Sequence, residues 1–129
     1  MTDPGSAPVP EEIRLKRRSR VLEVRFPAGE VYQLGFEYLR VYTPSAERRG
    51  HGGGEGRLEL GKEQVGINEV VPVGHYAVCL KFDDGHDSGL YSWKYLRELG
   101  RDFEARWSRY LERCAELSYE RKPPELPTR

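Results

Sequence analysis

The chain has 129 residues, which is enough for one domain of ordinary size and excludes a two-domain enzyme. Hydrophobic residues make up 37% of the sequence and charged residues 33%, so we expect a folded but very hydrophilic domain with a small core. The 21 basic and 21 acidic residues cancel, so the chain as a whole has no net charge that would attract nucleic acid or an anionic membrane.

The first ten residues are rich in proline and predict a disordered leader over residues 1–10. This stretch has neither the basic nor the apolar region of a signal peptide, and no apolar run in the chain approaches the roughly 20 residues that cross a bilayer. Cys79 and Cys114 stand far apart and form no C-x-x-C motif, which excludes a disulfide framework and favours a reducing compartment. We therefore expect a cytoplasmic protein without membrane contact.

Apolar and charged residues alternate from residue 11 onward, which predicts half-buried antiparallel strands. Proline, glycine and serine mark the turns between them. The predicted order is a strand around Ile13 and Leu15, a turn at residues 17–19, a strand with Leu22, Val24 and Phe26 on one face, a turn at residues 27–29 and a strand at residues 30–34.

Residues 35–42 predict a short helix or turn that ends before Pro44. The following stretch has five glycines between residues 50 and 56, which predicts a surface loop. Two more strands are expected at residues 65–73 and 76–82, followed by a hairpin turn of the Asp-Gly kind at residues 83–86.

The pattern becomes helical at Ser92, which is a plausible N-cap. Gly100 interrupts the apolar stripe that follows, so it either ends a first helix or weakens a continuous one. Pro123 and Pro124 end any helix and predict a disordered tail over residues 121–129. The stripe consists of Leu96, Leu99, Phe103, Trp107, Tyr110, Cys114 and Leu117.

These elements predict an α+β fold that is mainly β, with an antiparallel meander sheet, a short helix and a C-terminal helix. The stripe beyond Gly100 has to be buried, either on the chain's own sheet or against another copy or protein. Through Phe103, Trp107, Tyr110 and Leu117 it is a candidate surface for homo-oligomer formation.

Two polar loops form the candidate binding surface. A histidine beside carboxylates can bind zinc or iron, so a metal site made by His51, Asp84, His86 and Asp87 is one alternative. Solvated turns explain the same residues, and no H-x-D, H-E-x-x-H or C-x-x-C motif supports the metal site. The candidate surface comprises Ser45, Glu47, Arg48, Arg49 and His51 in the first loop and Asp83, Asp84, His86 and Asp87 in the second.

Three further signals are weak. The glycine-rich loop lacks the strand-to-helix setting of a phosphate loop. The basic run from Arg14 to Arg25 could contact RNA, although nearby glutamates dilute it, so nucleic-acid binding is not expected to be the main role. Cys79 and Cys114 lie in apolar surroundings, which favours inert packing over nucleophilic chemistry.

The segments VLEVRFPAGEVYQL, LRVYTPSAERRGHG and VGHYAVCLKFDDGHDSGLYSWKYLRELG resemble the gamma-butyrobetaine hydroxylase-like N-terminal domain family over about residues 13–100. The resemblance implies a family domain at residues 11–100 and a helical extension at residues 101–120. Members of that family occur as small stand-alone bacterial proteins, as the N-terminal domain of carnitine-pathway dioxygenases, and attached to Mrp-type iron–sulfur cluster carrier ATPases.

In the dioxygenases the domain holds a zinc ion with three cysteines and one histidine. The resemblance places Thr43, Ser45 and Arg48 at the cysteine positions and keeps only His86. Hydroxyl groups are poor zinc ligands and arginine is a cation, so we expect the domain to fold without zinc or another cofactor. The jelly-roll domain that carries the catalytic iron is absent from this sequence.

We therefore expect a non-catalytic binding or adaptor domain, with protein partners in iron–sulfur cluster or metal metabolism implied by the resemblance. The two polar loops should approach each other, because the corresponding regions meet at the zinc in the dioxygenase domain.

Overall fold

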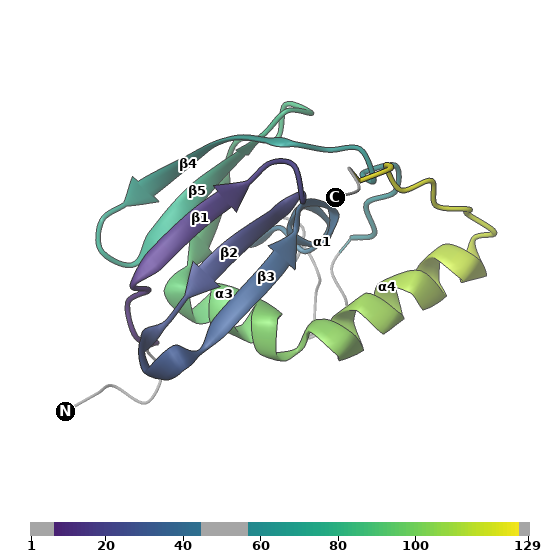
Figure 1. Ribbon diagram of the computed structural model, residues 1–129. Coiled ribbons are helices and arrows are strands. Elements are labelled where there is room, and N and C mark those ends of the chain that lie inside the picture. Colours follow the sequence, from purple (N-terminus) through teal and green to yellow (C-terminus); the bar gives the residue numbers. More distant parts are fainter. Residues whose placement is uncertain (1–6, 45–56, 127–129) are drawn as a thin grey trace.

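The computed structural model describes residues 7–44 and 57–126 and contains two three-stranded antiparallel sheets with helices packed against them (Figure 1). The predicted α+β class and its antiparallel meanders are confirmed. The strands divide between two meanders instead of forming one sheet.

The first sheet, sheet A, contains β1 (Glu12–Lys16), β2 (Val21–Arg25) and β3 (Val31–Gly35) in that order. The predicted apolar face of β2 is confirmed, since Leu22 and Val24 are fully buried. Glu23 on the opposite face is also buried, at 4% exposed, because Lys16, Arg25 and Gln33 bind its carboxylate. Between β2 and β3 the short turn η1 (Pro27–Gly29) places Ala28 and Gly29 at positive φ.

Helix α1 (Phe36–Val41) follows β3 directly and leads towards the second sheet. Sheet B contains β4 (Ile67–Val73), β5 (Ala77–Phe82) and β6 (Gly89–Ser92). Strand β6 was not predicted, because four residues that include glycine and serine give too short a pattern to recognise. It pairs with β5 across the Asp-Gly turn, which confirms the hairpin expected there.

Helix α3 (Trp93–Arg101) begins at the predicted cap, where the Ser92 side chain accepts a hydrogen bond from the Tyr95 amide at 3.0 Å. The apolar stripe is divided between two helices, because the helix is interrupted at Asp102 before α4 (Phe103–Glu116) begins. Gly100 lies inside α3, and a Cβ atom there would stand 2.3 Å from Cγ of Tyr32. This glycine therefore allows α3 to lie against β3.

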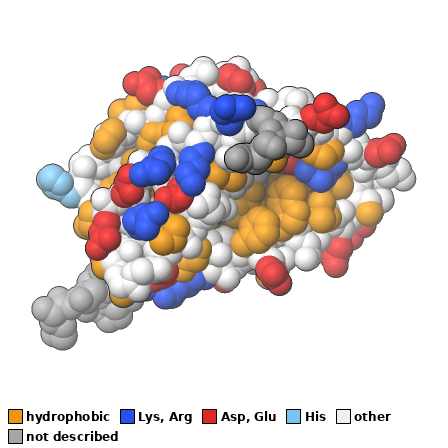
Figure 2. All heavy atoms as spheres, in the orientation of Figure 1, with side chains coloured by type: hydrophobic (Ala, Val, Ile, Leu, Met, Phe, Trp, Pro, Cys, Tyr) orange, Lys and Arg blue, Asp and Glu red, His pale blue; other side chains and the backbone are white. Residues whose placement is uncertain are grey.

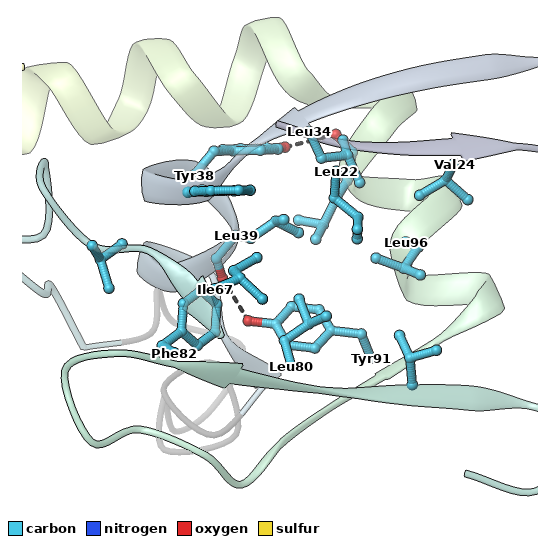
Figure 3. Packing of buried hydrophobic residues seen from close by; sticks show 14 of the residues in the cluster. Leu22, Val24, Leu34, Tyr38, Leu39, Ile67, Leu80, Phe82, Tyr91 and Leu96 are labelled. Atoms are coloured by element: carbon cyan, nitrogen blue, oxygen red, sulfur yellow. Dashed lines mark hydrogen bonds between the residues drawn. The ribbon is translucent and has the colours of Figure 1, made fainter. Parts of the chain in front are cut away.

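The main core lies between the two sheets and is closed by α1 and α3 (Figure 3). Leu39 of α1 lies at its centre and is fully buried. Two buried tyrosines connect the elements through backbone carbonyls: the Tyr91 hydroxyl donates to Leu39 at 2.6 Å and the Tyr38 hydroxyl to Leu99 at 2.7 Å. Other buried members of this core are Leu22, Val24, Phe26, Leu34, Ile67, Val78, Leu80, Phe82 and Leu96.

A smaller cluster accounts for part of the apolar stripe. Tyr110 and Cys114 of α4 are buried beside Val41, so this part of the stripe packs on its own chain. Phe103 and Leu117 remain 38% and 61% exposed. Self-association through the stripe stays a prediction.

The predicted tail contacts the fold over residues 121–126. Ser118 has a φ of 55°, and the amides of Ser118 and Tyr119 donate back to Ala115 and Cys114. This Schellman arrangement ends α4 and turns the chain back across the molecule, so that Arg121 and Lys122 bind side chains in the body of the domain. The predicted domain boundaries stay predictions.

Candidate functional site

Thr43 and His86 meet where α1 ends and the β5–β6 turn begins. The Thr43 hydroxyl lies 2.9 Å from Nε2 of His86, and Thr43 is only 1% exposed. The His86 carbonyl accepts from the Phe82 amide at 2.9 Å, which closes the turn. A Cβ atom on Gly89 would approach Thr43 Oγ1 to 2.9 Å, so glycine leaves room for this contact. The sequence resemblance aligns Thr43 and His86 with two different zinc-ligand positions of the family. The fold brings these two residues into contact.

A group of charged residues surrounds the same turn. Asp84 Oδ2 accepts from Arg40 Nε at 2.9 Å and from Lys62 Nζ at 2.7 Å, while its Oδ1 accepts from the His86 amide at 3.1 Å. Burial acts to raise the pKa of Asp84, but these three hydrogen bonds outweigh it and hold the pKa at about 2. Arg40 also lies 3.6 Å from Glu59, so the charges at this site are largely paired.

Burial, and then the positive charge of Arg40, lower the pKa of His86. The imidazole is therefore neutral at pH 7 and able to ligate a metal, yet its Nε2 faces Thr43. Within residues 7–44 and 57–126, no three His, Cys, Asp or Glu side chains are grouped so that they could hold a metal ion. The described residues thus give no support to the metal-binding alternative.

The other acidic residues of this turn have separate partners. Asp83 Oδ1 accepts from the Gly66 amide at 2.9 Å and ties the turn to the start of β4. The Asp87 carbonyl accepts from the Cys79 thiol at 3.2 Å. Asp83, Asp84, His86 and Asp87 share a turn without pointing to a common centre.

The first polar loop lies outside the described residues, so the predicted approach of the two loops stays a prediction. The residues concerned are Ser45, Glu47, Arg48, Arg49 and His51.

We expect chelation to leave the fold unchanged, because Thr43 and His86, which the sequence resemblance aligns with zinc-ligand positions, are joined to each other by a hydrogen bond. Treatment with EDTA should not change the melting temperature, and adding zinc afterwards should not raise it. A fall of many degrees on chelation, reversed by zinc, would contradict this expectation.

The Asp84 pairs predict an acid-dependent loss of stability. The pKa of about 2 in the folded protein lies below the ordinary value of 3.8, so the ionised carboxylate stabilises the fold above about pH 4. This contribution disappears as the pH falls from about 4 to 2. Thermal melting of wild type and Asp84→Asn should therefore differ most at pH 5 to 6 and converge near pH 2. Asp87→Asn is the matched control, and a wild-type–Asp84→Asn difference independent of pH would exclude this role.

Part of the basic hairpin is paired with acidic residues, and two of its arginines bind backbone carbonyls. Arg17 donates to the Ile67 and Asn68 carbonyls at 2.6 and 3.1 Å, and Arg20 donates to the Val65 carbonyl, so both tie sheet A to the start of sheet B. The ion pairs of the run are Arg14 with Glu12, Lys16 with Glu23, and Arg25 with Glu12 and Glu23, which reduce the positive charge that the hairpin presents. Nothing in this geometry favours the RNA-binding alternative.

Both cysteines are free thiols. Cys114 is buried in the small cluster, and burial raises the pKa of its thiol, which disfavours the nucleophilic thiolate.

A second region combines apolar and acidic side chains. We call it the α4 groove: a cavity of about 360 Å³ between sheet A, α1, α4 and the chain that follows α4. Its wall is aromatic, with Phe103 stacked on Trp107 at 6.0 Å between ring centres and packed edge-on to Tyr38 at 5.0 Å. Figure 2 shows hydrophobic side chains gathered at the surface between sheet A and α4.

Two carboxylates also line the α4 groove. Glu37 of α1 accepts a hydrogen bond from the Tyr110 hydroxyl at 2.7 Å and pairs with Arg121. Glu63 accepts from the Tyr119 hydroxyl at 2.7 Å and from the Lys122 amide at 2.9 Å. Burial acts to raise the pKa of Glu63, but these two hydrogen bonds outweigh it and lower the pKa.

The sequence predicted only one wall of this groove. The apolar stripe located Phe103 and Trp107, whereas Glu37, Glu63 and Arg121 carry no pattern of their own. Their partners are 56 to 84 positions away, so only the folded chain identifies them.

The sequence profile of the family described as gamma-butyrobetaine hydroxylase-like, N-terminal, matches residues 13–97. The chain belongs to this family. The resemblance seen in the sequence is thereby confirmed. A search of curated proteins gives no match.

Three solved structures are similar to this family member. One solution NMR structure is 42% identical, covers 98% of this chain and 95% of its own, and has a TM-score of 0.81. Another is 43% identical, covers 92% of this chain and 93% of its own, and has a TM-score of 0.76. A crystal structure of a DUF971 family protein of unknown function from Acidithiobacillus ferrooxidans is 45% identical, covers 77% and 98%, and has a TM-score of 0.62. Because the first NMR structure covers 98% of this chain, the similarity continues through α4, beyond residue 97 where the family profile ends.

Within the described ranges, no helix has both the length and the apolar character to span a membrane.

Proposed function

We propose that this protein is a cytoplasmic, non-catalytic adaptor domain that binds a protein partner through the α4 groove. The observation that carries the proposal is the surface cavity between sheet A and α4, which has an aromatic wall of Phe103 and Trp107 and two carboxylates in its lining. Apolar patches with a polar rim are typical of protein-binding sites.

The exposed part of the stripe supports this role. Phe103 is 38% exposed, whereas Tyr110 and Cys114 of the same helix are buried. Trp107 lies beside Phe103 in the wall of the groove. Aromatic residues are enriched among those that dominate binding energy. The polar cluster at His86 gives weaker support to a ligand site, because most of its polar atoms already pair with each other, although Nη1 of Arg40 is buried without a hydrogen-bond partner among the described residues.

The proposed link to iron–sulfur cluster or metal metabolism rests on the sequence resemblance and not on the α4 groove. The resemblance to domains attached to Mrp-type iron–sulfur cluster carriers supports a partner in iron–sulfur cluster or metal metabolism. In this proposal the domain supplies binding, and the partner supplies the cluster or the metal.

The test compares two substitutions on one helix. Phe103 and Leu111 are both 38% exposed, but only Phe103 lines the α4 groove. Affinity capture from native cells with Phe103→Glu should recover at least about tenfold less of a specific partner than wild type, whereas Leu111→Glu should recover the wild-type amount.

Equal recovery with both variants would reject the groove as the binding site. A groove-dependent partner that has no link to iron–sulfur clusters or metals would reject the metabolic assignment and leave the binding role intact.

A further inference from the structure

The chain turns back after α4 and lies along the α4 groove. We call residues Tyr119–Leu126 the C-terminal segment. Three of its side chains, Pro123, Pro124 and Leu126, line the cavity of about 360 Å³ together with Phe103 and Trp107. The segment thus occupies one side of the groove without filling it.

Arg121 occupies a defined position beside the aromatic wall. Its Nε and Nη2 donate to the two oxygens of Glu37 at 2.8 and 2.5 Å, which is the paired geometry that arginine forms with a carboxylate. Its guanidinium also lies over the Trp107 ring, 5.0 Å from the centroid. The Glu37 side chain is only 10% exposed and is held by Tyr110, so this acceptor is oriented by the body of the domain.

The next residue is bound through its backbone. The Lys122 amide donates to Glu63 at 2.9 Å, and the Lys122 carbonyl accepts from the Gln64 side chain at 2.7 Å. Both contacts come from residues just before β4 and bind the backbone of Lys122, so they do not depend on its side chain. Two prolines follow, which have no amide hydrogen and favour an extended conformation that aromatic grooves recognise.

We propose that the α4 groove is a binding site for a partner segment with an arginine two residues before a pair of prolines, and that the C-terminal segment is an internal competitor for it. The inference rests on the proposed function and names the ligand of the same groove. Glu37 and Trp107 bind the arginine, Glu63 and Gln64 bind the following backbone, and Phe103 and Trp107 contact the prolines. A partner binds by displacing the C-terminal segment.

The test uses the full chain and a labelled peptide with the sequence of residues 118–126. In wild type the internal segment competes, so fluorescence anisotropy should show weak binding. Arg121→Ala removes the contact with Glu37 from the internal segment alone and should raise peptide affinity at least about tenfold. A peptide with alanine in place of its arginine should lose this affinity.

A second pair of variants covers the case in which Arg121→Ala does not fold. Lys122→Pro removes the backbone amide that donates to Glu63, whereas Lys122→Ala keeps it. Lys122→Pro should therefore bind the added peptide more tightly than wild type, and Lys122→Ala should match wild type. Circular dichroism checks that each variant is folded.

Folded Arg121→Ala and Lys122→Pro variants that bind the peptide no better than wild type would overturn the inference and leave the C-terminal segment a structural element. If partner capture still depends on Phe103 in that case, the proposed function stands and only the ligand is wrong. A Lys122→Pro variant that dimerises and excludes the peptide would show that a second copy takes the groove, which also overturns the inference.

Discussion

Gly100→Ala should lower the free energy of unfolding by about 2 kcal/mol or more. A Cβ atom at this position would stand 2.3 Å from Cγ of Tyr32 and 2.5 Å from Cδ1, well inside contact distance. The ring cannot move aside easily, because Cγ is its attachment atom and the ring makes an edge-to-face pair with Phe26, with centroids 6.1 Å apart. Alanine favours helices over glycine by about 1 kcal/mol, so the overlap opposes and exceeds the helix preference.

A double-mutant cycle measures this overlap directly by chemical denaturation. In a Tyr32→Ala background the overlapping ring is gone, so Gly100→Ala should stabilise the protein by up to about 1 kcal/mol. The sign of the alanine effect should thus reverse between the two backgrounds. Destabilisation of the same size in both would show that Tyr32 is not the cause.

Leu39→Ala should cost about 3 kcal/mol, because the side chain is fully buried between the two sheets and its loss leaves a cavity. The substitution should also loosen the contacts that α1 makes on both sides of the core. Glu37 of α1 binds Arg121 at the α4 groove, and Arg40 binds Asp84. The Leu39 carbonyl itself accepts a hydrogen bond from the Tyr91 hydroxyl. Figure 3 shows Leu39 among side chains from both sheets and α3.

Urea unfolding of three variants checks this expectation. Leu39→Met keeps the volume and should cost less than about 1.5 kcal/mol. Leu111→Ala, on the outer side of α4, should change stability by no more than about 0.5 kcal/mol. A loss for Leu39→Ala as small as that for Leu111→Ala would show that the two sheets pack together without α1.

Local patterns were enough to predict most of the elements. Alternation in β2 identified the core-facing Leu22 and Val24, since a strand presents successive residues to opposite faces, but it did not predict the burial of Glu23. Ser92 marked the start of α3 because its hydroxyl can satisfy a free amide of the first turn. Family membership likewise followed from contiguous segments and was confirmed over residues 13–97. These features depend on residues close together in the chain.

The sequence by itself therefore determined the α+β class, the strands of β1 to β5, the helical region and the family. Only the tertiary structure decided how the strands divide into two sheets, where β6 pairs, and why glycine stands at position 100 against Tyr32. It also decided the candidate site, because Glu37 and Arg121 pair across 84 positions of sequence. A periodic pattern reports which face of one element is buried, whereas contacts between distant residues depend on how all the elements pack together.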